Sequence, residues 1–194
     1  MRINHFTGKR ILVPLGLAAI ISLPTCNRDR ELQNLSNETD NIDSLLYSVA
    51  KDLLHAHALK DNGYATLIEG DALLQARDTT EAQNRWREAL RYFDESINIE
   101  YRDINSIKGR AYALQRLGNL EEALFEYQHA VAMAETLGVA NNRDIAPLYN
   151  DLGTLYTELK QYDKAREFYQ RALSIDPEYQ TPKRNLALLD QKGY

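Results

Sequence analysis

The side chains that most often carry catalysis are scattered along this 194-residue chain. His55 and His57 lie two residues apart, and on a helix this spacing points them about 200° away from each other, which suits no shared metal ion. The sequence has no glycine-rich phosphate loop, no cluster of metal ligands and no compact grouping of serine, histidine and acid. An enzyme needs a preorganised pocket of such groups. The sequence therefore predicts no catalytic residue, no metal site, no cofactor and no small-molecule substrate, and hence no enzyme.

The one cysteine, Cys26, follows a segment with the features of a secretory signal. Residues 1–10 carry three basic side chains, and residues 11–23 are mainly apolar. As a helix this apolar run rises about 20 Å, which is less than the roughly 30 Å of a hydrocarbon core. A basic region, a short apolar region and a processing site are typical of a signal peptide that is removed.

The position of Cys26 resembles that of the cysteine in a bacterial lipoprotein signal, which is lipidated and becomes the first mature residue. Thr25 departs from that family, which usually has Gly, Ala or Ser here, and Pro24 is also unusual. The alternative is an uncleaved anchor with an incidental cysteine. Both interpretations export everything after Cys26, because the positive charge precedes the apolar run. The resemblance implies a lipid on Cys26, and Asn27 after it implies the periplasmic face of a bacterial outer membrane.

The charge balance argues against nucleic acid as a partner. The formal net charge is −5, and the residues after position 25 carry 20 basic and 28 acidic side chains. Such an acidic domain repels phosphates.

Apolar residues with a helical period occupy most of the chain after residue 41, most clearly at residues 146–179. They recur there at three- and four-residue steps in two stretches, which predicts two amphipathic helices. Small residues such as Gly153 and Ala172 alternate with large ones such as Tyr169, so the two helices can pack closely. Pro177 ends the unit because it cannot continue a helix.

In length, residue types and spacing this hairpin resembles a tetratricopeptide repeat (TPR). Ala165 opens its second helix, and Ala123 and Ala82 stand at matching positions 42 and 83 residues earlier, which indicates two further units with lengthened second helices. The resemblance implies an all-α, right-handed superhelical array of about three TPR hairpins, with an N-terminal extra helix and a C-terminal capping helix. The predicted segments are a signal peptide at 1–25, a polar tether at 26–41, an N-terminal helix at 42–61 and a TPR domain at 62–194, with repeats at about 63–101, 102–143 and 146–179 and the capping helix at 181–191.

The predicted N-terminal helix carries one apolar stripe. Its members are Ile42, Leu45, Leu46, Val49, Leu53 and Leu54. We expect this helix to pack on the first repeat as a cap or to be the remnant of a degenerate repeat half, and we expect Asn62–Gly63 to end it.

The resemblance to TPR arrays also implies a concave binding surface, lined by the first helix of each hairpin. The positions carried over as a partner-binding groove are Tyr64, Asp71, Gln75, Lys108, Tyr112, Gln115, Arg116, Asn150, Asp151, Thr154, Glu158 and Arg184. Any one of these alone is more often an ordinary surface residue. Lys108, Tyr112 and Arg116 share one helix face, where they are expected to form a small basic spot that suits a partner segment with one or two acids.

Some TPR domains hold the C-terminal carboxylate of chaperones with a clamp of lysine, asparagine and arginine. At the clamp positions this chain has Leu67, Asp71, Gly109 and Asp151, and the two acids would repel a carboxylate. The sequence therefore argues against that function.

The function that these features predict is a membrane-anchored module for protein–protein interaction, with a protein or peptide ligand in the groove. We expect it to act as an adaptor or assembly factor for an envelope complex. This expectation rests on the predicted fold and the predicted signal peptide alone. The alternatives are a self-associating structural scaffold at the membrane and an envelope enzyme.

Overall fold

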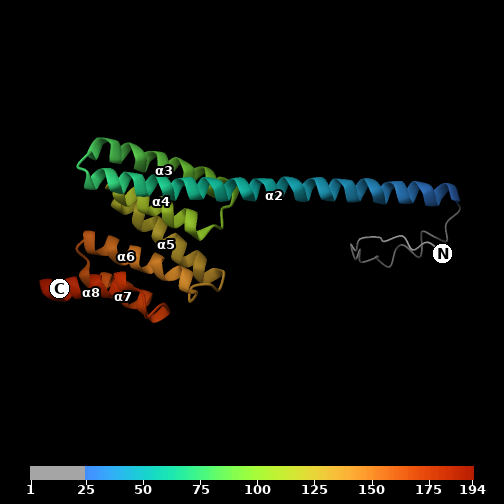
Figure 1. The fold of residues 1–194 in the computed structure, drawn as a ribbon. Helices are drawn as coiled ribbons and strands as arrows, with labels where there is room; N and C mark the ends of the chain where they lie inside the picture. The colour runs from blue at the N-terminus through green and yellow to red at the C-terminus, as the bar shows by residue number, and fades with distance from the viewer. Residues whose placement is uncertain (1–24) are drawn as a thin grey trace, which may run out of the picture. The chain divides into compact units, whose positions relative to one another are not determined.

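The computed structural model describes residues 25–194, so residues 1–24 of the predicted signal peptide lie outside the described residues (Figure 1). The chain divides into two compact units, residues 1–51 and residues 52–194. Every regular element of the described part is a helix, as the sequence predicts. None of the helices in residues 25–194 combines the length and the apolar character needed to cross a membrane.

Helix α2, Thr25–Gln75, contributes to both units and differs most from expectation. The structure has helix at residues 26–41, where we predicted a polar tether, and the predicted helix end at Asn62–Gly63 is wrong. Residues 26–62 contain no glycine and no proline, so nothing in that stretch stops a helix.

Gly63 serves for close packing, since a Cβ at this position would lie 2.8 Å from Cε1 of Phe93. Phe93 lies on α3, Thr79–Ile99, so the missing side chain is what lets the two helices approach each other. A glycine that looks like a helix stop in the sequence is therefore a packing residue.

The second unit consists of helical hairpins. The part of α2 from residue 52 on pairs with α3, α4 (Ile104–Arg116) pairs with α5 (Leu120–Thr136), and α6 (Ala146–Glu158) pairs with α7 (Tyr162–Ile175), followed by α8 (Gln180–Lys192). A short 3-10 helix, η1 (Arg143–Ile145), leads into α6. The three second helices have 21, 17 and 14 residues, so the lengthened second helices predicted for the first two hairpins are confirmed.

The core repeats one small-against-large contact in successive hairpins. Ala82, Ala123 and Ala165 are completely buried, which confirms the register of the three units. A Cβ on Gly153 would lie 2.7 Å from the ring of Tyr169, so these helices too meet where a side chain is absent.

Polar contacts join the first hairpin to the second. The Ser96 hydroxyl donates to the carbonyl oxygen of Ala56 at 3.0 Å and lies 2.9 Å from the Ser106 hydroxyl. Lys60 forms an ion pair of 2.9 Å with Asp103, the N-cap of α4. These contacts fix α2, α3 and α4 to one another around buried hydroxyl groups.

The apolar stripe of the predicted cap is exposed. Leu53 and Leu54 belong to the second unit and do not pack on the first repeat, contrary to expectation. The other four members, Ile42, Leu45, Leu46 and Val49, are exposed on α2 in the first unit.

Candidate protein-binding groove

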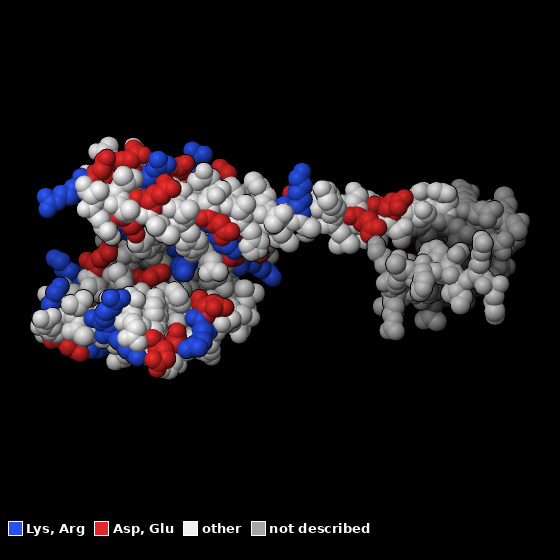
Figure 2. All heavy atoms as spheres, in the orientation of Figure 1, with Lys and Arg blue, Asp and Glu red and all other residues white. Residues whose placement is uncertain are grey.

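The first helices of successive hairpins surround a hollow in the second unit. Figure 2 shows this hollow between the α2–α3 pair and helices α6–α8, with acidic and basic side chains on its walls. Within it lies a cavity of about 220 Å³, called the groove pocket here, to which α2, α4 and α6 all contribute. Its lining residues are Tyr64, Leu67, Ile68, Asp71, Lys108, Tyr112 and Asp151. The structure therefore brings together five of the predicted groove residues.

Asp71 organises one side of the groove pocket. Its Oδ1 accepts hydrogen bonds from Trp86 Nε1 at 3.2 Å and from Arg116 Nε at 2.8 Å, and its Oδ2 accepts one from the Tyr112 hydroxyl at 2.6 Å. The Arg116 guanidinium also lies 4.8 Å from the centre of the Trp86 ring. The charges of Asp71 and Arg116 thus satisfy each other, and the predicted basic spot loses one of its two cations.

The two tyrosines of the groove pocket are held by internal hydrogen bonds. Tyr64 donates to the carbonyl oxygen of Asn105 at 2.7 Å and packs edge-on against Phe93, with 5.1 Å between ring centres. Burial raises the pKa of both phenols, and the hydrogen bond and charge of Asp71 add to the effect at Tyr112. Both side chains are therefore neutral at physiological pH.

Asp151 is the second carboxylate of the groove pocket, and it has few partners. It accepts one hydrogen bond, at 3.2 Å, from the side-chain amide of Asn150. Within residues 25–194, neither Asp151 nor Lys108 forms an ion pair within 4.0 Å. Burial raises the pKa of Asp151 to about 6, although Lys108 and the Asn150 hydrogen bond act in the opposite direction.

Lys108 places its charge over an aromatic ring of the groove pocket. Its Nζ lies 5.6 Å from the centre of the Tyr64 ring. A cation at this distance from a ring face is attracted by the ring quadrupole.

Four other predicted groove residues, Gln115, Asn150, Thr154 and Glu158, form contacts within the protein. Gln115 is buried, donates to Glu158 at 2.8 Å and accepts from the Tyr127 hydroxyl at 3.2 Å. Asn150 accepts from Asn185 at 3.1 Å, and the Thr154 hydroxyl donates to the Asn150 carbonyl.

Gln75 and Arg184 are exposed and do not line the pocket, whereas Leu67 and Ile68 do. These two apolar residues were not among the predicted groove positions, although Ile68 follows Tyr64 by one helical turn and shares its face.

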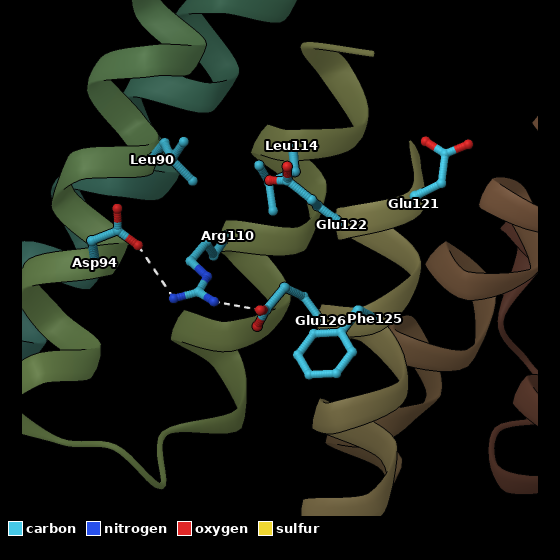
Figure 3. Close-up of a pocket in the computed structure, with 8 residues that line it drawn as sticks. All are labelled: Leu90, Asp94, Arg110, Leu114, Glu121, Glu122, Phe125 and Glu126. Carbon is cyan, nitrogen blue, oxygen red and sulfur yellow. Dashed lines mark hydrogen bonds and ion pairs between the residues drawn. The ribbon is translucent and has the colours of Figure 1, made fainter. Parts of the chain in front are cut away.

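A second cavity, of about 520 Å³, lies over α3, α4 and α5 (Figure 3). Arg110 bonds Asp94 on one side and Glu126 on the other, so it joins α3 to α5. The remaining lining residues are Leu90, Leu114, Glu121, Glu122 and Phe125.

Stacked helical hairpins with a hollow lined by their first helices define an α-helical solenoid. Residues 103–178 match the tetratricopeptide repeat family. A solved structure of the first TPR domain of human RPAP3 shares the fold, with a TM-score of 0.50 and 19% identity over 68% of this chain and 92% of that domain.

Curated relatives align with parts of the chain. The uncharacterized protein ycf37 of Pyropia yezoensis is 42% identical over 67 residues, or 34% of this chain and 38% of that protein. The Hsp70-Hsp90 organizing protein 3 of Arabidopsis thaliana is 26% identical over 98 residues, or 50% of this chain and 16% of that protein. The chain thus spans well under half the length of either relative.

Proposed function

We propose that this protein is a membrane-anchored adaptor that holds a segment of another protein in its groove pocket. The observation that carries the proposal is the pocket itself, in which α2, α4 and α6 present apolar, aromatic and charged side chains together. Convergence of a few polar groups on an apolar hollow is typical of a binding site. An adaptor or assembly role in an envelope complex follows from this site combined with the proposed export.

The anchor is proposed from the sequence around Cys26. The basic and apolar segments before it support export, and a lipid on its thiol would hold the domain at the periplasmic face of a bacterial outer membrane. The side chain of Cys26 lies outside the described part of the structure.

A chaperone-organising role is not part of the proposal. One relative is named for organising Hsp70 and Hsp90. Here Asp151 lines the pocket without an ion-pairing partner in the described chain, and a ligand that ends in a carboxylate would meet this charge at close range.

Affinity capture tests the proposed function. The full chain, extracted from its native envelope in mild detergent, should retain a partner that is lost when Ile68 is changed to Gln. Ile68 lines the groove pocket and is 70% exposed, so the change alters the site and not the core. Ile99→Gln, also at an exposed isoleucine but outside that pocket, is the matched control. Equal capture by both variants and the wild type would rule out the groove pocket as the binding site of the captured partner.

Self-association at the membrane is a second candidate function, which the exposed stripe on α2 favours. Ile42, Leu45, Leu46 and Val49 form an apolar helical face in the first unit, and a face of this kind marks an interaction site. If the stripe pairs copies of the chain, the detergent-extracted protein should be oligomeric by light scattering. Leu46→Gln should then make it monomeric, whereas Tyr47→Gln, beside it on the helix, should not.

A further inference from the structure

Asp151 has unused capacity for hydrogen bonds in the groove pocket. An ionised carboxylate can accept about four hydrogen bonds. Asp151 accepts one, from the neighbouring Asn150, at 3.2 Å. Asp71, by contrast, has three donors on its two oxygens. A ligand in this pocket therefore meets one carboxylate whose two oxygens both have donors and one that is free to bind.

The walls beside Asp151 suit a long aliphatic stem that carries a cation. Leu67 and Ile68 supply aliphatic surface, and Tyr64 and Tyr112 supply rings. Lysine and arginine bury their methylene stems on such surfaces while the charged head reaches a polar group. Lys108 already places its ammonium over the Tyr64 ring, so this wall accepts a cation.

We propose that the groove pocket is a subsite for a lysine or arginine side chain of the bound partner segment, with Asp151 as its counter-ion. This rests on the proposed function, since it names the chemistry that the groove recognises. It replaces the acidic segment expected from the sequence, because Arg116 is neutralised by Asp71 and no longer adds to a basic spot.

The other charged groups that face the site determine whether removing a charge should raise or lower the affinity for a cationic ligand. Asp71 on α2 is paired with Arg116 on α4, and Glu158 on α6 accepts from Gln115. Lys108 on α4 is the remaining cation of the pocket, and it competes with a cationic ligand for Asp151. Removing the Lys108 charge should therefore strengthen the binding of a cationic segment, and it should weaken the binding of an acidic one.

In the free protein, the ionised Asp151 carboxylate lowers the stability of the fold. Burial raises its pKa to about 6, so the ionised form still predominates at neutral pH but is less stable than that of an exposed aspartate, and an arriving cation would stabilise it. A side chain that lowers stability in a cavity is typical of binding sites.

Labelled nine-residue peptides, identical except for a central Lys, norleucine or Glu, probe this subsite on the full chain by fluorescence anisotropy. We expect the Lys peptide to bind about tenfold or more tightly than the norleucine peptide, and Asp151→Asn to abolish that preference. Lys108→Met should raise the affinity for the Lys peptide severalfold. Lys192→Met, an exposed removal of a charge on α8 outside the pocket, should leave all three affinities unchanged.

Equal binding of the Lys and norleucine peptides, absence of binding by all three, or a Lys preference that survives Asp151→Asn would overturn the proposal. If the Glu peptide binds most tightly and Lys108→Met weakens its binding, the pocket binds an acidic side chain, as the sequence predicted. The proposed function fails separately, when native capture does not depend on Ile68. A melting temperature of the Asp151→Asn variant at or above that of the wild type shows that the variant is folded.

Discussion

At the scale of single residues, two aspartates in one pocket differ because of their partners. Asp71 receives hydrogen bonds from an indole, a phenol and a guanidinium, so it holds α2, α3 and α4 together. Asp151 is held by a neighbouring amide alone. The same side chain is structural at one position and available to a ligand at the other. Sequence position gave both the same predicted role, because hydrogen bonds from distant helices leave no local pattern.

Asp151→Asn should stabilise the protein at neutral pH. The pKa of Asp151 rises from 3.8 to about 6 on folding, so the folded state binds the proton more tightly than the unfolded state. Wild-type stability therefore falls as pH rises through this window, while that of the asparagine variant does not. A shift of about two pKa units corresponds to a free energy of unfolding that is up to about 3 kcal/mol larger for the variant than for the wild type at pH 7.5. This difference should vanish below about pH 4. Urea unfolding at both pH values measures this difference. A higher stability of the variant that does not depend on pH would contradict the raised pKa of Asp151.

Cys26 should carry the lipid. Because it is the one thiol of the chain, labelled fatty acid should enter the wild type and not Cys26→Ser when the cells are grown with the label. Several acyl chains are needed for a firm anchor, so the serine variant should also leave the membrane fraction. Equal labelling of both proteins would favour the uncleaved anchor.

At the scale of elements, the start of α4 depends on Asp103. Its carboxylate accepts from the Asn105 backbone N–H at 3.0 Å and from the Ser106 hydroxyl at 2.8 Å, and it pairs with Lys60 at 2.9 Å. Burial tends to raise the pKa of Asp103, but the hydrogen bonds from Lys60 and Ser106 outweigh it and hold the pKa below 3.8. The ionised cap therefore contributes stability above about pH 4, and this contribution is lost as pH falls through the lowered pKa.

Asp103→Ala should cost about 2–4 kcal/mol at pH 7, because it removes a helix cap and leaves Lys60 without its partner. Asp144→Ala, at an exposed aspartate in η1, should cost much less. The two are compared by urea unfolding at pH 7. Similar losses would show that the junction between α2 and α4 does not need this ion pair.

The third hairpin tests the close packing of small residues. Ala172 is completely buried on α7, and leucine there would overpack the contact with α6 at a cost of about 1–3 kcal/mol. Ala187→Leu, at an exposed position on α8, is the control and should change the melting temperature little. An unchanged melting curve for Ala172→Leu would mean that α6 and α7 pack less closely than described.

Most of this architecture could be predicted from the sequence, because helical periodicity and alternating residue size depend on local spacing. Ala82, Ala123 and Ala165 have the predicted register for that reason. The course of α2 could not be predicted, since Gly63 signals a turn locally and is retained in a helix by Phe93, 30 residues further on. The groove residues were placed on the right helices, but some of their partners, such as Arg116 for Asp71, come from other hairpins.

At the scale of the whole domain, the groove pocket joins three hairpins that otherwise contact mainly their neighbours. Tyr64 comes from α2, Lys108 and Tyr112 from α4, and Asp151 from α6. In a repeat array each unit is stabilised chiefly by the next one, so a ligand that touches three units couples them. Binding in the pocket should therefore stabilise the array beyond the residues that the ligand contacts.

Hydrogen exchange on the full chain, with and without a saturating Lys peptide, measures this coupling. At about 100 times its dissociation constant, the ligand should stabilise the domain by about 2.7 kcal/mol. Amide protection should rise in α2 from residue 52 on, in α4 and in α6, which supply the lining of the pocket. Asp151→Asn should remove the effect. If protection rose instead along α3 and α5, around the ion bridge of Arg110 in Figure 3, the peptide would be bound at the second cavity, and the concave surface would not be its site.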